Sequence, residues 1–377
     1  MLMKKIILLL LSISIFNNCI AQQTITDTLY HNGFTRNFNV FLPVNYVEGE
    51  SLPLVFNFHG LGSNMTQQQF YSEMDTVANE QNFIVCYPDG IDNAWNSGFG
   101  GSVDDVGFTD KMIGYIHEKY NIDLSRVYSC GMSNGGYMSY SLSCELSERF
   151  AAIASVTGSM AIGYMPTCNP ERILPFMQIH GTNDNTVQYN GDGISASIDD
   201  VVSFWTEKWM CAPIDITFTD VADIDITDET TATNYKYFCD ADLIGELYVV
   251  EGGAHTWPGA SFEIDVTNND FEASEVIWEF FNQFSTENPP TPLVGLNDNV
   301  LANKFVVQPN PFTNNVTVEG HITINNLEVY NINGRLLKII PSNELQTTID
   351  LSDLQPGLYY LKLTTAEGNF TKTLIKK

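Results

Sequence analysis

Residues 126–138 read RVYSCGMSNGGYM, and the interpretation of the whole chain starts from them. A short apolar run leads into Gly131, Met132, Ser133, Asn134 and Gly135, and a helix-like segment follows. A Gly-x-Ser-x-Gly stretch in this setting is typical of a sharp strand-to-helix turn that exposes the serine. Strand-like runs alternate with helical ones on both sides of it, between residues 52 and 181. This alternation predicts βαβ units and an α/β fold with a mostly parallel central sheet.

The exposed serine needs partners before it can do chemistry. A serine hydroxyl becomes a useful nucleophile only with a base within hydrogen-bond reach, a group that orients this base, and donors for the oxyanion. In α/β-hydrolases the chain order is serine, then acid, then histidine. His255 fits the base, because it lies in the Gly-rich loop GGAHTWPG after a strand-like run. His321 falls in a separate C-terminal region, and His180 precedes the best acid candidate.

That acid candidate is Asp184. It directly follows the apolar run PFMQIHG, in a polar loop. Asp192, Asp199 and Asp200 lie farther from a strand end and are less suitable alternatives. The expected order is therefore Ser133, Asp184 and His255, with Ser133 as the nucleophile.

The oxyanion donors are predicted from two loops. One donor is the backbone N–H that follows the nucleophile, at Asn134. The second is the N–H of Leu61 in the loop FHGLGSN, where Gly60 and Gly62 permit a close approach of the backbone. His59 is then expected to brace this loop and not to act as a base.

Taken together, several motifs resemble one enzyme family. FHGLGSN, YPDG…WNSG, DDVGF, RVYSCGMSNGGYM, FMQIHGTNDNTVQY and EGGAHTWPG are similar to the polyhydroxybutyrate-depolymerase-like branch of carbohydrate esterase family 1, which includes feruloyl and acetyl-xylan esterases. The resemblance covers about residues 27–284 and implies an α/β-hydrolase with the same three catalytic residues. It also implies two disulfides, Cys144–Cys168 and Cys211–Cys239. Cys86 and Cys130 lie inside apolar strands and are expected to be buried thiols.

The two ends of the chain predict export. Residues 1–21 combine two lysines, an apolar run and a small residue at Ala21, which is the pattern of a secretory signal peptide. No other segment is apolar and long enough to cross a membrane. Residues 285–302 are rich in proline and polar residues and are expected to form a linker, so the esterase domain spans residues 22–284.

After the linker the pattern changes to short strands and turns, with hairpins expected through Asn333-Gly334 and Glu367-Gly368. This pattern predicts a small all-β sandwich over residues 303–377. The motifs VQPNPF, LEVYNINGR and GLYYLKLTTAEGNFTKTLIKK resemble the C-terminal sorting domain of the type IX secretion system of Bacteroidota. This resemblance implies passage across the outer membrane by the type IX machinery, usually with removal of the domain and release or surface attachment of the rest. A carbohydrate-binding module is the alternative, but the domain contains no tryptophan to form a binding platform.

Composition limits the partners. The formal charge is −28, from 45 acidic and 17 basic residues, which disfavours binding to nucleic acid. The sequence contains no Cys-x-x-Cys pair, and the acidic stretch 215–230 lacks the spacing of an EF-hand loop, so we expect no metal and no cofactor. Asp104 and Asp105 are expected chiefly to cap a helix.

The substrate is less closely defined than the reaction. Trp95 and Trp257 flank motifs near the expected pocket and are predicted to stack on a sugar or phenolic ring. We expect feruloyl or acetyl esters of plant or algal polysaccharides, with polyhydroxybutyrate or another polyester as the alternative. A secreted polysaccharide-binding protein without catalytic activity is the alternative of another class.

Overall fold

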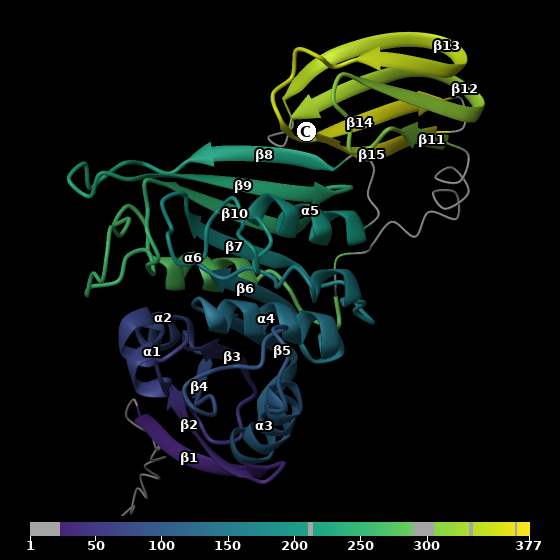
Figure 1. Ribbon diagram of the computed structural model, residues 1–377. Helices are drawn as coiled ribbons and strands as arrows, with labels where there is room; N and C mark the ends of the chain where they lie inside the picture. Colours follow the sequence, from purple (N-terminus) through teal and green to yellow (C-terminus); the bar gives the residue numbers. More distant parts are fainter. Residues whose placement is uncertain (1–22, 210–213, 289, 291–304, 332–334, 366–367) are drawn as a thin grey trace, which may run out of the picture.

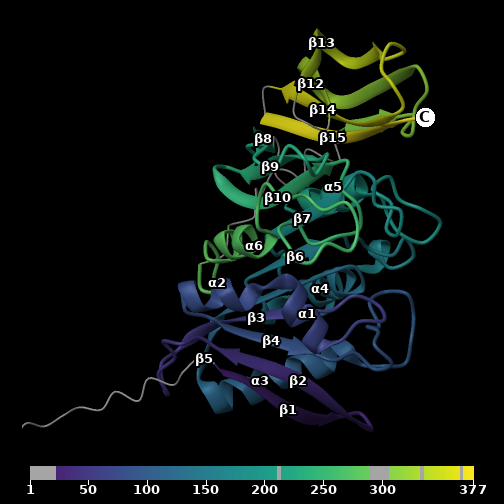
Figure 2. The same cartoon turned by 90° about the vertical axis from the view of Figure 1, so that its left-hand side faces the viewer.

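The computed structural model describes residues 23–209, 214–288, 290, 305–331, 335–365 and 368–377. These residues form a ten-stranded sheet with helices on both faces and a smaller antiparallel sheet beside it (Figures 1 and 2). The predicted signal peptide, Cys211 and most of the predicted linker lie outside the described residues.

The large sheet has the strand order β1-β2-β4-β3-β5-β6-β7-β10-β9-β8. Its six central strands, from β4 to β10, run parallel, and antiparallel strands extend it at both edges. The mostly parallel sheet that the sequence predicts therefore corresponds to the centre of this larger sheet. The strands are β1 (Gln23–His31), β2 (Phe34–Leu42), β3 (Leu52–Phe58), β4 (Ile84–Pro88), β5 (Ile122–Gly131), β6 (Ala152–Val156), β7 (Phe176–Gly181), β8 (Asp215–Asp220), β9 (Thr231–Cys239) and β10 (Asp242–Glu251).

Helices cover both faces of this sheet because its central strands are apolar on both sides. All seven residues of β3 are buried, and successive side chains enter opposite cores: Phe56 packs in one and Val55 in the other. Residues of α3, α4 and α5 complete the first core, and residues of α2 and α6 complete the second. The helices are α1 (Met65–Ser72), α2 (Met74–Gln81), α3 (Asp105–Tyr120), α4 (Asn134–Glu145), α5 (Ile198–Lys208) and α6 (Ala273–Phe281), with short 3-10 turns η1 (Ser147–Arg149) and η2 (Met165–Thr167).

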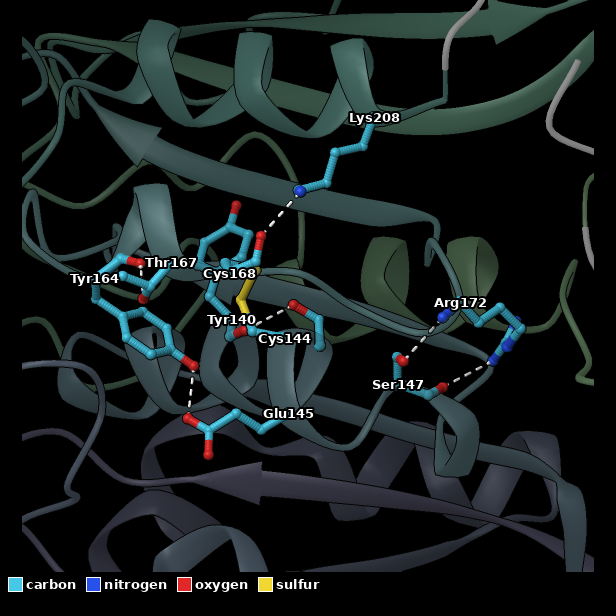
Figure 3. The surroundings of a disulfide bond; sticks show 10 residues. Tyr140, Cys144, Glu145, Ser147, Tyr164, Thr167, Cys168, Arg172 and Lys208 are labelled. Atoms are coloured by element: carbon cyan, nitrogen blue, oxygen red, sulfur yellow. Dashed lines mark hydrogen bonds between the residues drawn. A yellow bond between two sulfur atoms is a disulfide. The ribbon is translucent and has the colours of Figure 1, made fainter. Parts of the chain in front are cut away.

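One disulfide ties the end of α4 to the loop after β6. Cys144 and Cys168 are bonded, as the family resemblance implies, and the bond spans 24 residues of sequence. Figure 3 shows that Lys208 of α5 donates to the backbone oxygen of Cys168, at 2.9 Å. The bridge therefore joins segments that cover the same face of the sheet. Cys86 and Cys130 are buried free thiols, as predicted.

The C-terminal part is all-β, as predicted. Its five antiparallel strands form one hydrogen-bonded network in which β12 pairs with β11, β13 and β14, and β15 pairs with β14. The two predicted hairpins correspond to β12–β13 and β14–β15, although the predicted turn residues Asn333, Gly334 and Glu367 lie outside the described residues. The strands are β11 (Phe305–Gln308), β12 (Asn315–Asn331), β13 (Leu336–Asp350), β14 (Gly357–Thr365) and β15 (Gly368–Lys376).

Candidate active site

The carboxyl ends of the six parallel strands lie along one edge of the sheet, where ligands of α/β folds usually bind. Ser133 follows β5 at this edge, Asp184 follows β7 and His255 follows β10. The loop that carries Leu61 follows β3. The parallel strands thus bring together Ser133, Asp184 and His255, although 51 positions separate the first two in the sequence and 71 separate the last two.

Ser133 occupies a sharp turn between β5 and α4. Its φ is 55° and its ψ is −119°, which are unfavourable for a residue with a side chain. The turn is held by the hydrogen bond from the Ser133 N–H to the Val156 carbonyl, at 2.8 Å. The predicted strand-to-helix turn is therefore present, and it keeps the serine side chain half-buried at the sheet edge.

The glycines of the motif allow this turn to pack against β3. A Cβ atom on Gly135 would lie 2.1 Å from the Phe58 carbonyl oxygen, and one on Gly131 would lie 2.6 Å from the same atom. Backbone atoms cannot move away as a flexible side chain can. Any larger residue at Gly135 would therefore displace the helix that begins after Ser133.

Asp184 and His255 meet at this edge. The Nδ1 atom of His255 donates to Oδ2 of Asp184 at 2.7 Å. The Asp184 side chain is buried, and the His255 side chain is 17% exposed. With Nδ1 bound to the carboxylate, Nε2 is the ring atom left to exchange a proton with a substrate or a nucleophile. This is the geometry of a carboxylate that orients a general base.

The loop around Asp184 prepares this carboxylate to stay ionised. Its Oδ1 atom accepts hydrogen bonds from the N–H groups of Thr186 and Val187, at 2.8 and 2.9 Å. Burial opposes ionisation, but hydrogen bonds from His180 and His255 outweigh it and hold the pKa of Asp184 well below its usual range. Asp184 can therefore stabilise a positive charge on His255 throughout the neutral pH range.

His180 also lies near Asp184 but is differently placed. Its Nε2 atom donates to the Val187 carbonyl at 2.8 Å and lies 3.4 Å from Asp184 Oδ2, while its Nδ1 atom accepts from Gln178 at 3.0 Å. The ring is fully buried, and both nitrogens are used. His180 therefore fixes the acid loop, and the structure favours His255 as the base.

The Ser133 hydroxyl has no hydrogen-bond partner among the described residues. Within the described residues it makes no hydrogen bond, so its contact with His255 stays a prediction. Hydrogen bonds of this kind are often long without substrate and tighten when the substrate binds.

Two backbone N–H groups next to Ser133 are available as oxyanion donors. In the part of the chain that the structure describes, neither the Leu61 N–H nor the Asn134 N–H donates a hydrogen bond. The two loops are adjacent, because a Cβ atom on Gly60 would lie 3.4 Å from the Ser133 Cβ. Asn134 is also the first residue of α4, where the helix dipole favours negative charge. Their role as oxyanion donors stays a prediction.

His59 braces the Leu61 loop. Its Nδ1 atom donates to the Gly60 carbonyl at 2.8 Å, and its Nε2 atom accepts from the Gly90 N–H at 3.0 Å. Burial lowers the pKa of His59, so the ring stays neutral and keeps this arrangement. The predicted bracing role agrees with these contacts.

Both predicted substrate-stacking tryptophans are buried. Trp95 is 4% exposed and donates from Nε1 to the His59 carbonyl at 2.9 Å. Trp257 is 1% exposed, and its Nε1 atom donates to Ser274 Oγ at 3.3 Å. These contacts favour a packing role that supports the loops. Stacking of either indole on a substrate stays a prediction, and it would require the loops to open.

Sequence reasoning missed two polar supports of the site. The Asn134 side chain accepts from the Trp95 N–H at 2.7 Å and donates to Ser97 Oγ at 2.7 Å, so it fixes the loop after β4. Behind this loop, Arg36 and Asp105 form a fully buried ion pair at 2.6 Å. Asp104 does cap α3, but Asp105 is a core residue. The only signal for the pair was two adjacent acids at a helix start.

Other sequence expectations concern metals and membranes. Among the described residues, no group of three or more His, Cys, Asp or Glu side chains is arranged to hold a metal ion. The same part of the chain contains no helix with the length and apolar character needed to span a bilayer. The acidic stretch 215–230 contains the mostly exposed strand β8.

The fold and the Ser-Asp-His arrangement together define an α/β-hydrolase. A solved acetyl xylan esterase from Aspergillus awamori shares this fold, with a TM-score of 0.50 and 17% identity over 70% of this chain and 99% of that protein. The C-terminal residues 306–377 match the family described as the secretion system C-terminal sorting domain. The chain therefore carries a tail for export by the type IX secretion system.

Relatives in sequence are esterases. A bifunctional acetylxylan esterase/xylanase from Neocallimastix patriciarum is 24% identical over 71% of this chain and 36% of its own length. Feruloyl esterase B from Piromyces equi is 33% identical over 40% of this chain and 30% of its own length. Feruloyl esterase D from Neurospora crassa is 26% identical over 70% of this chain and 86% of its own length. The chain thus spans about a third of the first two relatives and most of the third.

Proposed function

We propose that this protein is a secreted serine carboxylesterase that removes feruloyl or acetyl groups from plant or algal polysaccharides. The observation that carries the proposal is the 2.7 Å pair of His255 and Asp184 at the same sheet edge as the sharp turn that holds Ser133. In the proposed division, residues 22–284 form the esterase domain, residues 285–302 the linker and residues 303–377 the sorting domain.

The proposed reaction proceeds through an acyl-enzyme. Ser133 Oγ attacks the ester carbonyl carbon and passes its proton to Nε2 of His255, while Asp184 stabilises the imidazolium. The N–H groups of Leu61 and Asn134 hold the negative oxygen of the tetrahedral intermediate. Cleavage of the ester bond releases the sugar hydroxyl, which takes the proton from His255. Water then attacks the acyl group with His255 as base, and the acid leaves with Ser133 restored.

Apolar side chains near the nucleophile support an acyl-binding role. Phe99, in the loop that Asn134 fixes, is 48% exposed, and its ring centroid lies 5.0 Å from that of Tyr137. Tyr137 is buried one helical turn after Ser133, so this pair places an exposed aromatic face beside the nucleophile. Leu61 on the loop after β3 is 72% exposed. An aromatic acyl group stacked on Phe99 could gain about 0.5–1.5 kcal/mol beyond its buried area.

The proposal is tested by the products. The purified chain should release ferulate from feruloylated xylan or acetate from acetylated xylan, measured by mass spectrometry alongside polyhydroxybutyrate. Release of hydroxybutyrate alone would assign the enzyme to the polyester depolymerases. Absence of hydrolysis of every ester, including p-nitrophenyl acetate, would leave a non-catalytic binding protein.

A matched pair of variants separates the two polysaccharide esters. Phe99→Ala should lower kcat/KM for methyl ferulate several-fold more than for p-nitrophenyl acetate, because only the aromatic acyl group stacks. Phe218→Ala is the control, since Phe218 is 60% exposed on β8, the edge strand of the large sheet, five positions from β5 in the strand order. Equal losses on both esters in Phe99→Ala would contradict the feruloyl preference.

A further inference from the structure

The segment between β10 and α6 exposes a run of apolar side chains. Five consecutive residues of this segment are exposed and alternate between apolar and acidic side chains; they are Phe262, Glu263, Ile264, Asp265 and Val266. The three apolar side chains are 59%, 55% and 43% exposed, in chain order. Large apolar side chains that gather on the surface of a protein usually mark a place where another molecule binds. The 261–266 loop is therefore a candidate binding surface.

This loop is joined to the backbone on both sides of His255. The Val266 carbonyl accepts a hydrogen bond from the Ala254 N–H at 3.0 Å. The same carbonyl accepts from the Thr256 hydroxyl at 3.3 Å. The 261–266 loop therefore lies directly beside the residue that is proposed as the base.

Side-chain contacts fix the position of the loop. The Ser261 hydroxyl donates to the Glu73 carboxylate, which lies between α1 and α2, at 2.5 Å. The Asn269 side chain donates to Oε1 of Glu263 at 3.0 Å. A loop that is already held in place loses little conformational freedom when a ligand binds to it.

A second loop, residues 221–230 between β8 and β9, extends this surface. The Asp270 carboxylate accepts hydrogen bonds from the N–H groups of Ile224 and Asp225, at 2.7 and 3.0 Å. Ile224 and Ile226 are 72% and 80% exposed. Figure 1 shows the connection between β8 and β9 and the segment after β10 at the same end of the large sheet. All these residues belong to the hydrolase part, so the surface does not depend on the tail.

The proposed reaction determines which part of a substrate meets this surface. The leaving oxygen takes its proton from Nε2 of His255, so it must come within hydrogen-bond reach of this atom. The alcohol part of the ester therefore lies on the His255 side of the site. Phe99, proposed to stack on the acyl group, follows β4, whereas His255 follows β10. These two strands lie on opposite sides of β5 in the sheet.

We propose that the 261–266 loop, extended by Ile224 and Ile226, binds the uncharged polysaccharide chain to which the ester group is attached. The Phe262 ring can pack on the C–H face of a sugar. Within the described residues, Oε2 of Glu263 and Oδ2 of Asp265 have no hydrogen-bond partner, so they can accept from sugar hydroxyls. The same carboxylates repel a polymer that carries uronate groups. The choice of a polysaccharide rests on the proposed function.

Two esters that share an acyl group separate this surface from the acyl side. Phe262→Ala should lower kcat/KM for feruloylated arabinoxylan oligosaccharides by about fivefold, because the stacking face is lost. Methyl ferulate should change less than about twofold, because methanol is too small to stack on the ring. Leu124→Ala is the control and should leave both esters unchanged, since Leu124 is 41% exposed near the start of β5, at the opposite edge of the sheet. For an enzyme that accepts only acetate, ethyl acetate and acetylated xylohexaose form the matching pair.

The charge of the loop is tested with an anionic polymer. At low ionic strength, the double variant Glu263→Gln, Asp265→Asn should raise kcat/KM for acetylated pectin several-fold, because repulsion between like charges is removed. It should leave ethyl acetate unchanged. An unaltered ratio of the two rates would contradict the selection of uncharged chains.

Binding of unesterified xylohexaose tests the surface without catalysis. Calorimetric titration of the full chain should show saturable binding that Phe262→Ala weakens and Leu124→Ala does not, with folding checked by circular dichroism. Absence of binding, or binding that Phe262→Ala does not weaken, would overturn the proposal. So would equal losses on the oligosaccharide ester and methyl ferulate, because Phe262 would then act through His255. Binding through Phe262 in a chain that hydrolyses no ester would support this surface and refute the proposed function.

Discussion

The catalytic edge of the large sheet and the core of the C-terminal domain treat polar groups in opposite ways. Around the catalytic edge, charged and amide side chains such as Asp184, His180 and Gln178 are fully or nearly fully buried and bound to one another. The core of the tail consists of apolar side chains, and of its described residues only Thr365 and Lys376 are buried polar side chains.

This difference indicates that the buried polar groups of the hydrolase part serve a reaction, whereas the apolar core of the tail serves only its stability. Burial of a polar group costs free energy unless the group is hydrogen-bonded. Several buried polar side chains that bind one another are therefore held in fixed positions before a substrate binds. Such an arrangement is what stabilises charge that develops during a reaction. The tail buries almost no such groups, which agrees with a role in sorting. We therefore expect the effects on function and on pH sensitivity to be confined to the hydrolase part.

The largest effect is expected for the nucleophile. Ser133→Ala should lower turnover of p-nitrophenyl acetate by up to about 10⁶-fold, because no acyl-enzyme can form. Thermal unfolding should be nearly unchanged, since the Ser133 hydroxyl makes no hydrogen bond within the described residues. Ser102→Ala, in the exposed loop before α3, is the control. Appreciable activity in a folded Ser133→Ala protein would disprove the mechanism.

The second-largest loss of activity is expected for the acid, Asp184. Asp184→Asn should lower kcat by about 10³–10⁴-fold, because an amide no longer stabilises charged His255 or fixes its tautomer. Asp200→Asn should retain full activity, as its side chain lies at the exposed start of α5. His180→Gln should mainly lower the melting temperature, since it removes a buried hydrogen bond to Val187. An activity loss in His180→Gln equal to that of His255→Gln would reassign the base.

Stability should respond most to the disulfide. Replacing Cys144 and Cys168 together by alanine should cost about 3–4 kcal/mol of unfolding free energy, from the loop entropy released to the unfolded chain. The measurement is urea unfolding with and without dithiothreitol. Equal stability of the double variant and the oxidised wild type would show that the bridge contributes nothing.

A smaller effect is expected from Asp75, a half-buried carboxyl group in the first turn of α2. Its oxygens accept from Tyr87 and Gln69, but burial raises its pKa to about 6. A raised carboxyl pKa means that the unfolded chain ionises first, so stability should fall as pH rises from about 4 to about 6. We expect a loss of about 1–2 kcal/mol over this window.

Asp75→Asn should remove this fall in stability, measured by urea unfolding at pH 4.5, 6 and 7.5. Asp92→Asn, at an exposed turn, is the control and should keep it. Asp184 works in the opposite sense: its pKa is lowered, so its contribution is lost only as the pH falls below about 4. A pH profile that is the same in the wild type and in Asp75→Asn would contradict the assignment.

Removal of the tail should change catalysis least. A chain that ends at Asn288 keeps the hydrogen bonds of Tyr128 to the Phe284 carbonyl and of the Thr286 N–H to Ser125. Its kcat/KM on p-nitrophenyl acetate should stay within about twofold of the full chain, because separate domains keep their own cores. Export in the native host should fail. Efficient export without the tail would refute the sorting role.

Much of the fold could be predicted from the sequence. The alternation of apolar and helical runs predicts the parallel sheet, and the glycines around Ser133 predict the turn, because both are local patterns. The chain order of Ser133, Asp184 and His255 follows from the fold class. The two hairpins of the tail were also predicted, since strand alternation and turn residues are read over a few positions.

Contacts between distant segments could not be predicted in this way. Trp95 and Trp257 flank the right motifs, yet the local sequence does not show that the folded chain covers both indoles. Arg36 and Asp105 are 69 positions apart, and only the packing of β2 against α3 makes them a buried pair.

The sequence by itself determined the turn at Ser133, the candidate acid and base, and the division into a hydrolase part and an all-β tail. Only the tertiary structure shows how the two histidines near Asp184 differ: hydrogen bonds with Val187 and Gln178 use both ring nitrogens of His180, whereas His255 binds Asp184 through Nδ1. It also decided that Asp199, one of the rejected acids, lines a cavity under the tail. The physical reason is the range of the interactions: backbone conformation follows neighbouring residues, whereas burial and hydrogen-bond partners depend on segments brought together by the sheet.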